Sequence, residues 1–215
     1  MKDLIKLKAW FFVPLVFLVV LAFRIIMLFP KGDLHLMMNR FHSGFLDLFF
    51  NLVTWMGDGM IILVLCFILL FFSFRLSAYI ITTYAATGIF VQLLKHLFFD
   101  DVLRPAGYFK DIASLYMVEG VKMYYNHSFP SGHAATAFGL FLCLAMVMKN
   151  KLAQFLCLVL AIITAYSRVY LSQHFLLDIV VGALIGITGS IAIYPFFYRN
   201  EKKWHQLSIL SWIKK

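Results

Sequence analysis

The side chains that could do chemistry in this chain of 215 residues stand at the ends of long apolar segments. They are three cations, two histidines and one carboxylate: Lys95, Arg104, Arg168, His133, His174 and Asp178. An ionisable group beside a membrane-length apolar segment is costly unless it is paired or faces water. Brought together, these residue types predict an anion-binding site that also contains acid and base groups.

The run FPSGH at residues 129–133 indicates that the anion is a phosphate. Pro130 stands just before an apolar helix, Ser131 suits the N-cap, and Gly132 leaves room for a ligand to approach backbone N–H groups closely. The first N–H groups of a helix have no partner within the helix and bind anions. The sequence therefore predicts a phosphate at this helix start.

His174 and Asp178 are four residues apart, and we expect both at the start of one helix and on the same face. A carboxylate there can hold one imidazole nitrogen and leave the other as a nucleophile. The four-residue interval continues with Gly182, Gly186 and Ser190, a stripe of small residues that favours close packing against neighbouring helices.

These residues resemble the three-part signature of the type-2 phosphatidic acid phosphatase superfamily, the lipid phosphate phosphatases, whose site is shared with vanadium haloperoxidases. Residues 129–133 are similar to its Pro-Ser-Gly-His element. The run from Ser167-Arg168 through His174 to Asp178 matches its Ser-Arg…His…Asp element in type and spacing. The first element, a lysine followed by an Arg-Pro pair, differs from the family pattern in its spacing. Eight residues separate Lys95 from Arg104, where the family usually has six. The signature covers about residues 95–178.

The resemblance implies that His174 attacks phosphorus to give a phosphohistidine and that Asp178 orients it. His133 would protonate the leaving group and later activate water. The phosphoryl oxygens would be held by Lys95, Arg104, Ser131, the Gly132 amide and Arg168. Phosphoryl transfer needs mainly positioning and charge stabilisation, which three cations and a helix N-terminus supply, so we expect neither a metal nor another cofactor.

The composition is 63% hydrophobic and 13% charged, more apolar surface than a soluble domain of this length can bury. We therefore expect an all-α integral membrane bundle of six transmembrane helices, with residues 1–215 forming a single domain. The expected spans are 10–30, 58–74, 77–98, 132–148, 152–171 and 174–197. The first is interpreted as a retained helix and not as a secretory signal, because no small-residue cleavage site follows it.

Two connecting segments have an interfacial composition. Residues 31–57 are expected to form an amphipathic helical segment on the outer side, and residues 99–131, rich in Tyr and Phe, to lie at the headgroup level. The histidines that match no motif are interpreted as loop residues: His42, His96 and His127. The pair Asp100-Asp101 could suggest a cation site, but we interpret it as balancing Lys95 and Arg104. The three cysteines fall inside predicted spans and are interpreted as packing residues: Cys66, Cys143 and Cys157.

The net charge of +9 reflects membrane orientation and does not indicate a nucleic-acid partner. The side that holds both termini carries eleven basic residues: Lys2, Lys6, Lys8, Arg75, Lys149, Lys151, Arg199, Lys202, Lys203, Lys214 and Lys215. The other side carries seven, three of them in the predicted site. This predicts a multi-pass protein of a bacterial inner membrane with cytoplasmic termini and a site that faces the periplasm or outside. No obligate protein partner can be inferred.

Three functions compete. The first is a phosphatase acting on a lipid phosphomonoester or diphosphate, with undecaprenyl diphosphate, phosphatidylglycerophosphate, phosphatidic acid and lipid A phosphate all open as substrates. The second is a vanadate-dependent haloperoxidase, which ranks lower because those relatives are mostly soluble. The third is a non-catalytic lipid-binding or transport protein, against which the two histidines and the aspartate argue, since a binder needs no nucleophile.

Overall fold

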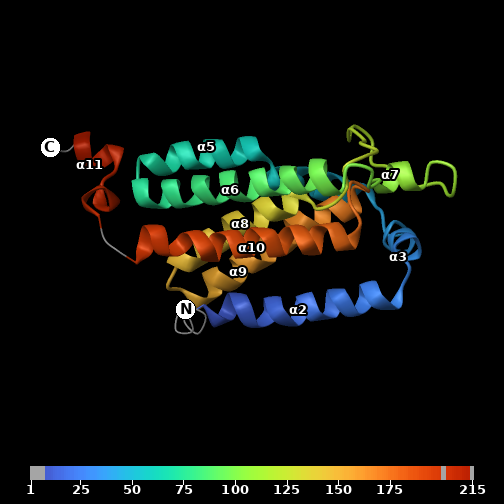
Figure 1. Cartoon of the computed structure of the whole chain (residues 1–215), viewed down its shortest axis with the longest axis horizontal. Helices are drawn as coiled ribbons and strands as arrows, with labels where there is room; N and C mark the ends of the chain where they lie inside the picture. Colours follow the sequence, from blue (N-terminus) through green and yellow to red (C-terminus); the bar gives the residue numbers. More distant parts are fainter. Residues whose placement is uncertain (1–7, 200–201, 214–215) are drawn as a thin grey trace.

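The computed structural model describes residues 8–199 and 202–213, and within these residues all regular structure is helical (Figure 1). The elements in chain order are α2 (Ala9–Leu28), α3 (Lys31–Met38), α4 (Gly44–Val53), η1 (Thr54–Gly57), α5 (Gly59–Leu70), α6 (Phe74–Phe98), α7 (Pro105–Tyr108), α8 (Gly132–Val147), α9 (Lys151–Tyr170), α10 (Leu176–Tyr198), η2 (Lys203–Gln206) and α11 (Ile209–Ile213). The long helices run along one common direction, and the all-α prediction is confirmed.

Short polar residues set the starts of several helices. A helix leaves its first N–H groups unpaired, and a Ser, Asp or Asn side chain at the N-cap can accept from one of them. Asp58 accepts from Met60 N–H at 2.8 Å, and Asn150 accepts from Ala153 N–H at 3.0 Å. Ser43, Ser73 and Ser131 do the same for α4, α6 and α8. These caps fix where each apolar segment enters the bundle.

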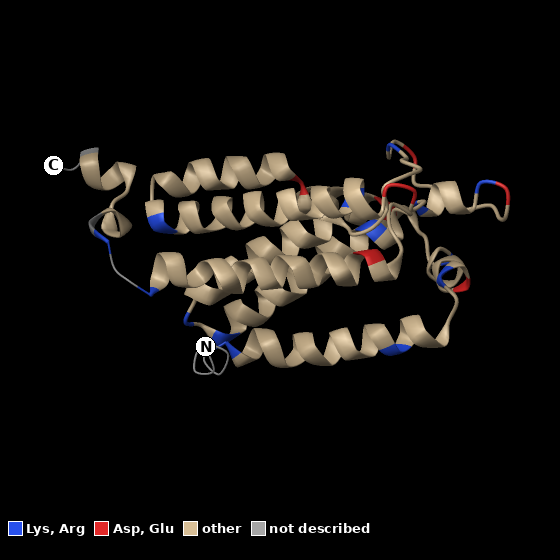
Figure 2. Ribbon diagram, viewed as in Figure 1, with Lys and Arg blue, Asp and Glu red and all other residues tan. Residues whose placement is uncertain are grey.

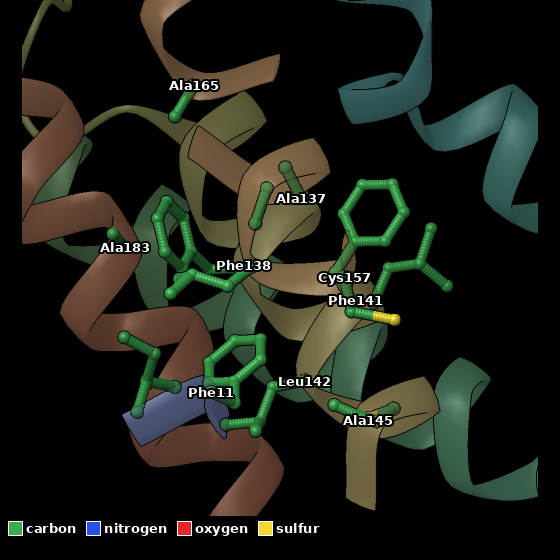
Figure 3. Packing of buried hydrophobic residues seen from close by; sticks show 14 of the residues in the cluster. Phe11, Ala137, Phe138, Phe141, Leu142, Ala145, Cys157, Ala165 and Ala183 are labelled. Carbon is green, nitrogen blue, oxygen red and sulfur yellow. The ribbon is translucent and has the colours of Figure 1, made fainter. Parts of the chain in front are cut away.

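Helix α8 forms the centre of the bundle, packed between α6, α9 and α10. Eleven of its 16 residues are buried. Figure 3 shows bulky side chains of this core, Phe138 and Phe141 of α8 and Phe11 of α2, packed among alanines such as Ala183 of α10. The small partners let the helix axes approach closely, as the stripe on α10 predicts. The three cysteines are free and buried, as expected of packing residues.

The outside of the bundle is apolar. On α2 only Phe11, Phe12 and Leu15 are buried, whereas Val13 and Phe17 are each 67% exposed. Figure 2 shows charges gathered at the two ends of the bundle, with helix bodies between them that carry almost none. A soluble protein does not expose so large a contiguous apolar surface. The chain is a multi-pass membrane protein.

Fewer helices meet the length of a membrane span than the six that the sequence predicts. Four are long and apolar enough, and the bent pair formed by residues 44–57 and α5 raises the number to five if the pair counts as one span. Helix α8 is apolar but has only 16 residues. Helices occupy all six predicted segments, but six complete crossings stay a prediction.

The predicted interfacial segment 31–57 divides into α3, α4 and η1, and the bend between η1 and α5 measures 59°. The bend occurs at Asp58, where the chain leaves η1 and caps α5. Gly57 lies so close to α8 that a Cβ there would be 3.0 Å from the carbonyl oxygen of His133. The bend thus places η1 directly beside one of the predicted catalytic residues.

Candidate active site

The predicted site residues come together at one end of the bundle, opposite the end where α2 begins and α11 lies (Figure 1). Four helices deliver them from their ends. Lys95 lies in the last turn of α6, His133 in the first turn of α8, Arg168 in the last turn of α9, and Asp178 in the first turn of α10. In Figure 2 this is the end where basic and acidic residues occur together.

His174 and Asp178 face one another, with Nδ1 and Oδ2 3.4 Å apart. The prediction that both start the same helix is wrong for His174, because α10 begins at Leu176 with Phe175 as its N-cap. Asp178 accepts from the Phe175 N–H at 2.9 Å, so its carboxylate satisfies the helix start and turns back toward the imidazole. Both side chains are almost completely buried.

Ser128 joins this pair from a distant loop. Its hydroxyl donates to Oδ2 of Asp178 at 2.5 Å and lies 3.4 Å from Nδ1 of His174. The side chain of Ser128 has no exposed surface. Hydrogen bonds to a carboxylate are stronger than those between neutral groups, so Ser128 fixes the orientation of Asp178.

The two residues before Ser128 hold two of the cations. Lys95 Nζ donates to the carbonyl oxygen of His127 at 2.8 Å, and Arg104 Nε donates to that of Asn126 at 2.9 Å. Consecutive carbonyls thus receive Lys95 and Arg104, although eight residues separate them in the sequence. We refer to residues 126–128 as the anchor loop, because it contacts four site residues from one short segment.

Arg168 is positioned from two sides. Its Nη1 donates to Oγ1 of Thr54 at 2.9 Å, and its Nη2 lies 3.5 Å from Oε1 of Gln173. Nη1 of Arg104 lies 3.5 Å from the same Gln173 oxygen, so the two guanidinium groups converge. Nε of Arg168 is buried and has no hydrogen-bond partner within residues 8–199 and 202–213.

The start of α8 is pressed against α10. A Cβ at Gly182 would lie 2.3 Å from the carbonyl oxygen of Ser131, and one at Gly186 would lie 2.2 Å from that of Ala135. Ser131 N–H donates to the carbonyl oxygen of Asp178 at 3.0 Å. The predicted small-residue stripe is therefore confirmed as a packing seam, and it holds the α8 start beside Asp178.

The site is electrostatically positive, and its ionisable side chains are largely buried. Burial, reinforced by Arg104 and Arg168, holds the pKa of His174 well below its usual range. The imidazole is therefore neutral at pH 7 and has a lone pair available for attack on an electrophile.

Sequence reasoning missed three positioning groups. Ser128, the carbonyl of His127 and Thr54 make contacts that no motif specifies. Ser128 lies three residues before the helix cap, which was the one local signal available. The others approach from segments far away in the sequence.

Comparison with known proteins identifies the family. Residues 76–202 match the model of the PAP2 superfamily. A lipid A 4'-phosphatase of Bacteroides thetaiotaomicron is 29% identical over 169 residues, which cover 75% of this chain and 74% of that protein. A putative undecaprenyl-diphosphatase of Escherichia coli, YbjG, is 33% identical over 92 residues, which cover 41% of this chain and 44% of that protein.

Two solved structures have the same fold. LpxE of Aquifex aeolicus superposes with a TM-score of 0.66 at 27% identity, covering 75% of this chain and 92% of LpxE. A PAP2-type phosphatidylglycerolphosphate phosphatase of Bacillus subtilis superposes with a TM-score of 0.65 at 20% identity, covering 94% of this chain and all of that protein.

Proposed function

Because the chain belongs to the PAP2 superfamily and is a lipid phosphatase of that family, we propose that it hydrolyses a lipid phosphate at the outer membrane face through a phosphohistidine, without a metal at the reacting phosphorus. The observation that carries the proposal is the convergence of Lys95, Arg104 and Arg168 on the buried pair His174 and Asp178. This places positive charge around a neutral, oriented nucleophile.

In the first step Nε2 of His174 attacks phosphorus, and the bond from phosphorus to the lipid oxygen breaks. His133 gives its proton to the leaving oxygen; its protonated form is favoured once the negative charge of the bound phosphate offsets the cations around it. Asp178 holds Nδ1 of His174, which stabilises the positive charge that forms on the imidazole. Attack by a neutral imidazole is supported by the lowered pKa of His174.

In the second step His133 takes a proton from water, and the water oxygen attacks phosphorus. The bond from phosphorus to Nε2 breaks, which frees His174 and releases inorganic phosphate. The phosphoryl oxygens are held by Lys95, Arg104, Arg168, Ser131 and the Gly132 N–H. The unpaired Nε of Arg168 supports this assignment, because a buried donor without a partner is costly until a ligand accepts from it.

A groove on the bundle supports a path for the lipid chain. An apolar groove of about 430 Å³ runs between α6 and α10, the helices that carry Lys95 and Asp178, and is lined by residues such as Phe90, Val181 and Leu184. A substrate whose chain follows this groove presents its headgroup at the end where the cations lie. The lipid A 4'-phosphatase relative makes a lipid A phosphate group the first substrate to test.

The test is phosphate release from lipid A, undecaprenyl diphosphate, phosphatidylglycerophosphate and phosphatidic acid, with EDTA present, by the parent protein and by His174→Asn. Release by the parent and its loss in the variant are expected. When the substrate phosphate carries ³²P, the parent should retain label as a phosphohistidine, which is labile in acid and stable in base. A thermal unfolding curve of the variant that matches the parent's shows that the fold is intact. Equal release by both proteins would mean that His174 is not the nucleophile.

A further inference from the structure

Two histidines and a carboxylate meet on the surface beside the anchor loop, and none of them takes part in the proposed reaction. The cluster consists of His96 in the last turns of α6, Asp100 four residues later, and His127 at the centre of the anchor loop. One ligand atom from each residue lies within 4.8 Å of the other two. The distance from Asp100 Oδ1 is 3.2 Å to Nδ1 of His127 and 3.8 Å to Nδ1 of His96.

These separations suit a small divalent cation. Ligands of a tetrahedral Zn²⁺ at about 2.0–2.1 Å from the metal lie about 3.3–3.4 Å from one another. Two imidazoles with one carboxylate form a known ligand set for this metal and leave a fourth position for water. The side chains of His96 and Asp100 are 60% and 71% exposed, so an ion can enter from solvent.

Simple ion pairing explains the cluster less well. Nδ1 of His127 is shielded from solvent, yet it makes no hydrogen bond within the described part of the chain, although Asp100 Oδ1 is 3.2 Å away. An imidazole paired with a carboxylate normally aligns its N–H with the oxygen. The unpaired nitrogen is instead directed into the same small space as the other two ligand atoms, where a cation would satisfy it.

A cation bound here would restrain a strained part of the anchor loop. His127 has φ of 56°, in the left-handed region, which costs a residue with a side chain roughly 1–2 kcal/mol. Its carbonyl accepts from Lys95, and the next residue, Ser128, holds Asp178. Asp100 belongs to the segment that makes the interval between Lys95 and Arg104 longer than the family pattern.

We propose that a Zn²⁺-class divalent cation binds His96, Asp100 and His127 and further rigidifies the anchor loop, which holds Lys95 and Asp178 through its own hydrogen bonds when the ion is absent. The ion is structural, since its ligands are separate from the groups assigned to the reacting phosphate. The interpretation of His96 as a loop residue is wrong, because His96 lies in the last turn of α6, whereas His127 lies in a loop.

The first test measures Zn²⁺ binding to detergent-solubilised, untagged protein that has been stripped with EDTA, in competition with a chromophoric chelator. We expect one Zn²⁺ for each chain of the parent, and at least tenfold weaker binding by Asp100→Asn and His96→Gln. Asp101→Asn is the matched control, because it removes a neighbouring carboxylate outside the cluster, and it should bind as the parent does. Absence of binding by the parent, or equal loss in both aspartate variants, would overturn the proposal.

The second test uses hydrogen–deuterium exchange to measure whether Zn²⁺ restrains the anchor loop. Zn²⁺ should slow deuterium uptake in the peptide that contains residues 126–128 in the parent and in Asp101→Asn, and should leave it unchanged in Asp100→Asn. Unchanged uptake in a parent that does bind Zn²⁺ would show that the ion does not restrain the loop. Neither measurement depends on catalysis, so a failure here is distinct from a failure of the proposed phosphatase reaction.

Discussion

The hydroxyl of Ser128 donates to Oδ2 of Asp178 at 2.5 Å, across 50 residues of sequence. This contact connects the anchor loop with the first turn of α10. Through it, a segment that holds Lys95 and Arg104 by its carbonyls also orients the carboxylate that faces His174. In the proposed mechanism, binding of the phosphate and orientation of His174 therefore both depend on one short loop.

Replacing this hydroxyl should affect catalysis more than binding. In Ser128→Ala the carboxylate of Asp178 loses a hydrogen bond of the charged type, for which about 1.5–3 kcal/mol is typical. We expect kcat to fall about ten- to hundredfold with KM little changed, because Ser128 is not assigned to the phosphate. Ser128→Thr keeps the hydroxyl and should recover part of the rate. A rise in KM at constant kcat would contradict the orienting role.

Loss of the contact between Thr54 and Arg168 should instead affect KM more than kcat. Thr54→Val keeps the shape of the side chain but removes the 2.9 Å acceptor for Arg168 Nη1. Arg168 then holds phosphate less well, and KM should rise about three- to tenfold, since a lost hydrogen bond amounts to about 1 kcal/mol. Thr164→Val is the control, because the Thr164 hydroxyl donates to the Leu160 carbonyl oxygen one turn earlier in its own helix. Equal effects of the two substitutions would argue against a role for Thr54.

The packing seam between α8 and α10 can be tested by adding one methyl group. In Gly182→Ala the new Cβ would meet the Ser131 carbonyl oxygen at 2.3 Å, so α8 and α10 must separate. Overpacking of this kind costs about 1–3 kcal/mol, and the melting temperature in detergent should fall. Gly88→Ala is the control, because no atom lies within 4 Å of its Cβ, and it should be neutral or slightly stabilising. A similar fall in melting temperature in both variants would show that close packing at Gly182 does not contribute more to stability than the uncrowded helical position at Gly88 does.

Local sequence signals predicted the parts of the fold that depend on local chemistry. The Ser131 cap and the stripe through Gly182 are both found, because capping and four-residue periodicity act within one or two helical turns. The bend at Asp58 was missed, since a capping Asp inside an apolar run looks like the edge of a straight span. The start of α10 at Leu176, two residues after His174, was missed because the carboxylate of Asp178 caps the helix there.

The site shows the same division. The motif residues were identified from their types and spacing, and they lie at one end of the bundle. Ser128, Thr54 and the His127 carbonyl could not be identified in this way, because their partners are 50, 114 and 32 residues away in sequence. A carbonyl has no residue type, so its role appears only once the backbone is folded.

The proposed orientation predicts which positions a membrane-impermeant maleimide reaches in intact cells. Ile112, which is 68% exposed in the connection between α6 and α8, should be labelled from outside as Ile112→Cys. Lys149→Cys, between α8 and α9, should be labelled only after permeabilisation. The native cysteines are buried and give a low background. Labelling of Lys149→Cys alone in intact cells would place the site on the cytoplasmic side.

The last prediction concerns pH and His35, which lies in α3 outside the spanning helices. Its ring is 2% exposed, packs against Phe109 and Phe175, and is held by the Ser172 hydroxyl at 3.2 Å from Nε2. Burial lowers the pKa of His35 to about 4, an effect that outweighs the opposing attraction of Asp178. The folded protein therefore keeps this imidazole neutral where the unfolded chain already binds a proton.

Between pH 6.5 and about 4 the unfolded state binds more protons, so the free energy of unfolding falls as the pH falls through this window. The contribution of His35 is fully present above pH 6.5, and its loss by pH 4 amounts to about 3 kcal/mol, at 1.36 kcal/mol for each pKa unit. His35→Gln removes the titrating group while keeping a hydrogen-bonding side chain. Melting temperatures in detergent are measured from about one unit above this window down to its lower edge, at about pH 4. They should fall more steeply for the parent than for this variant, and parallel curves would show that His35 does not titrate on unfolding.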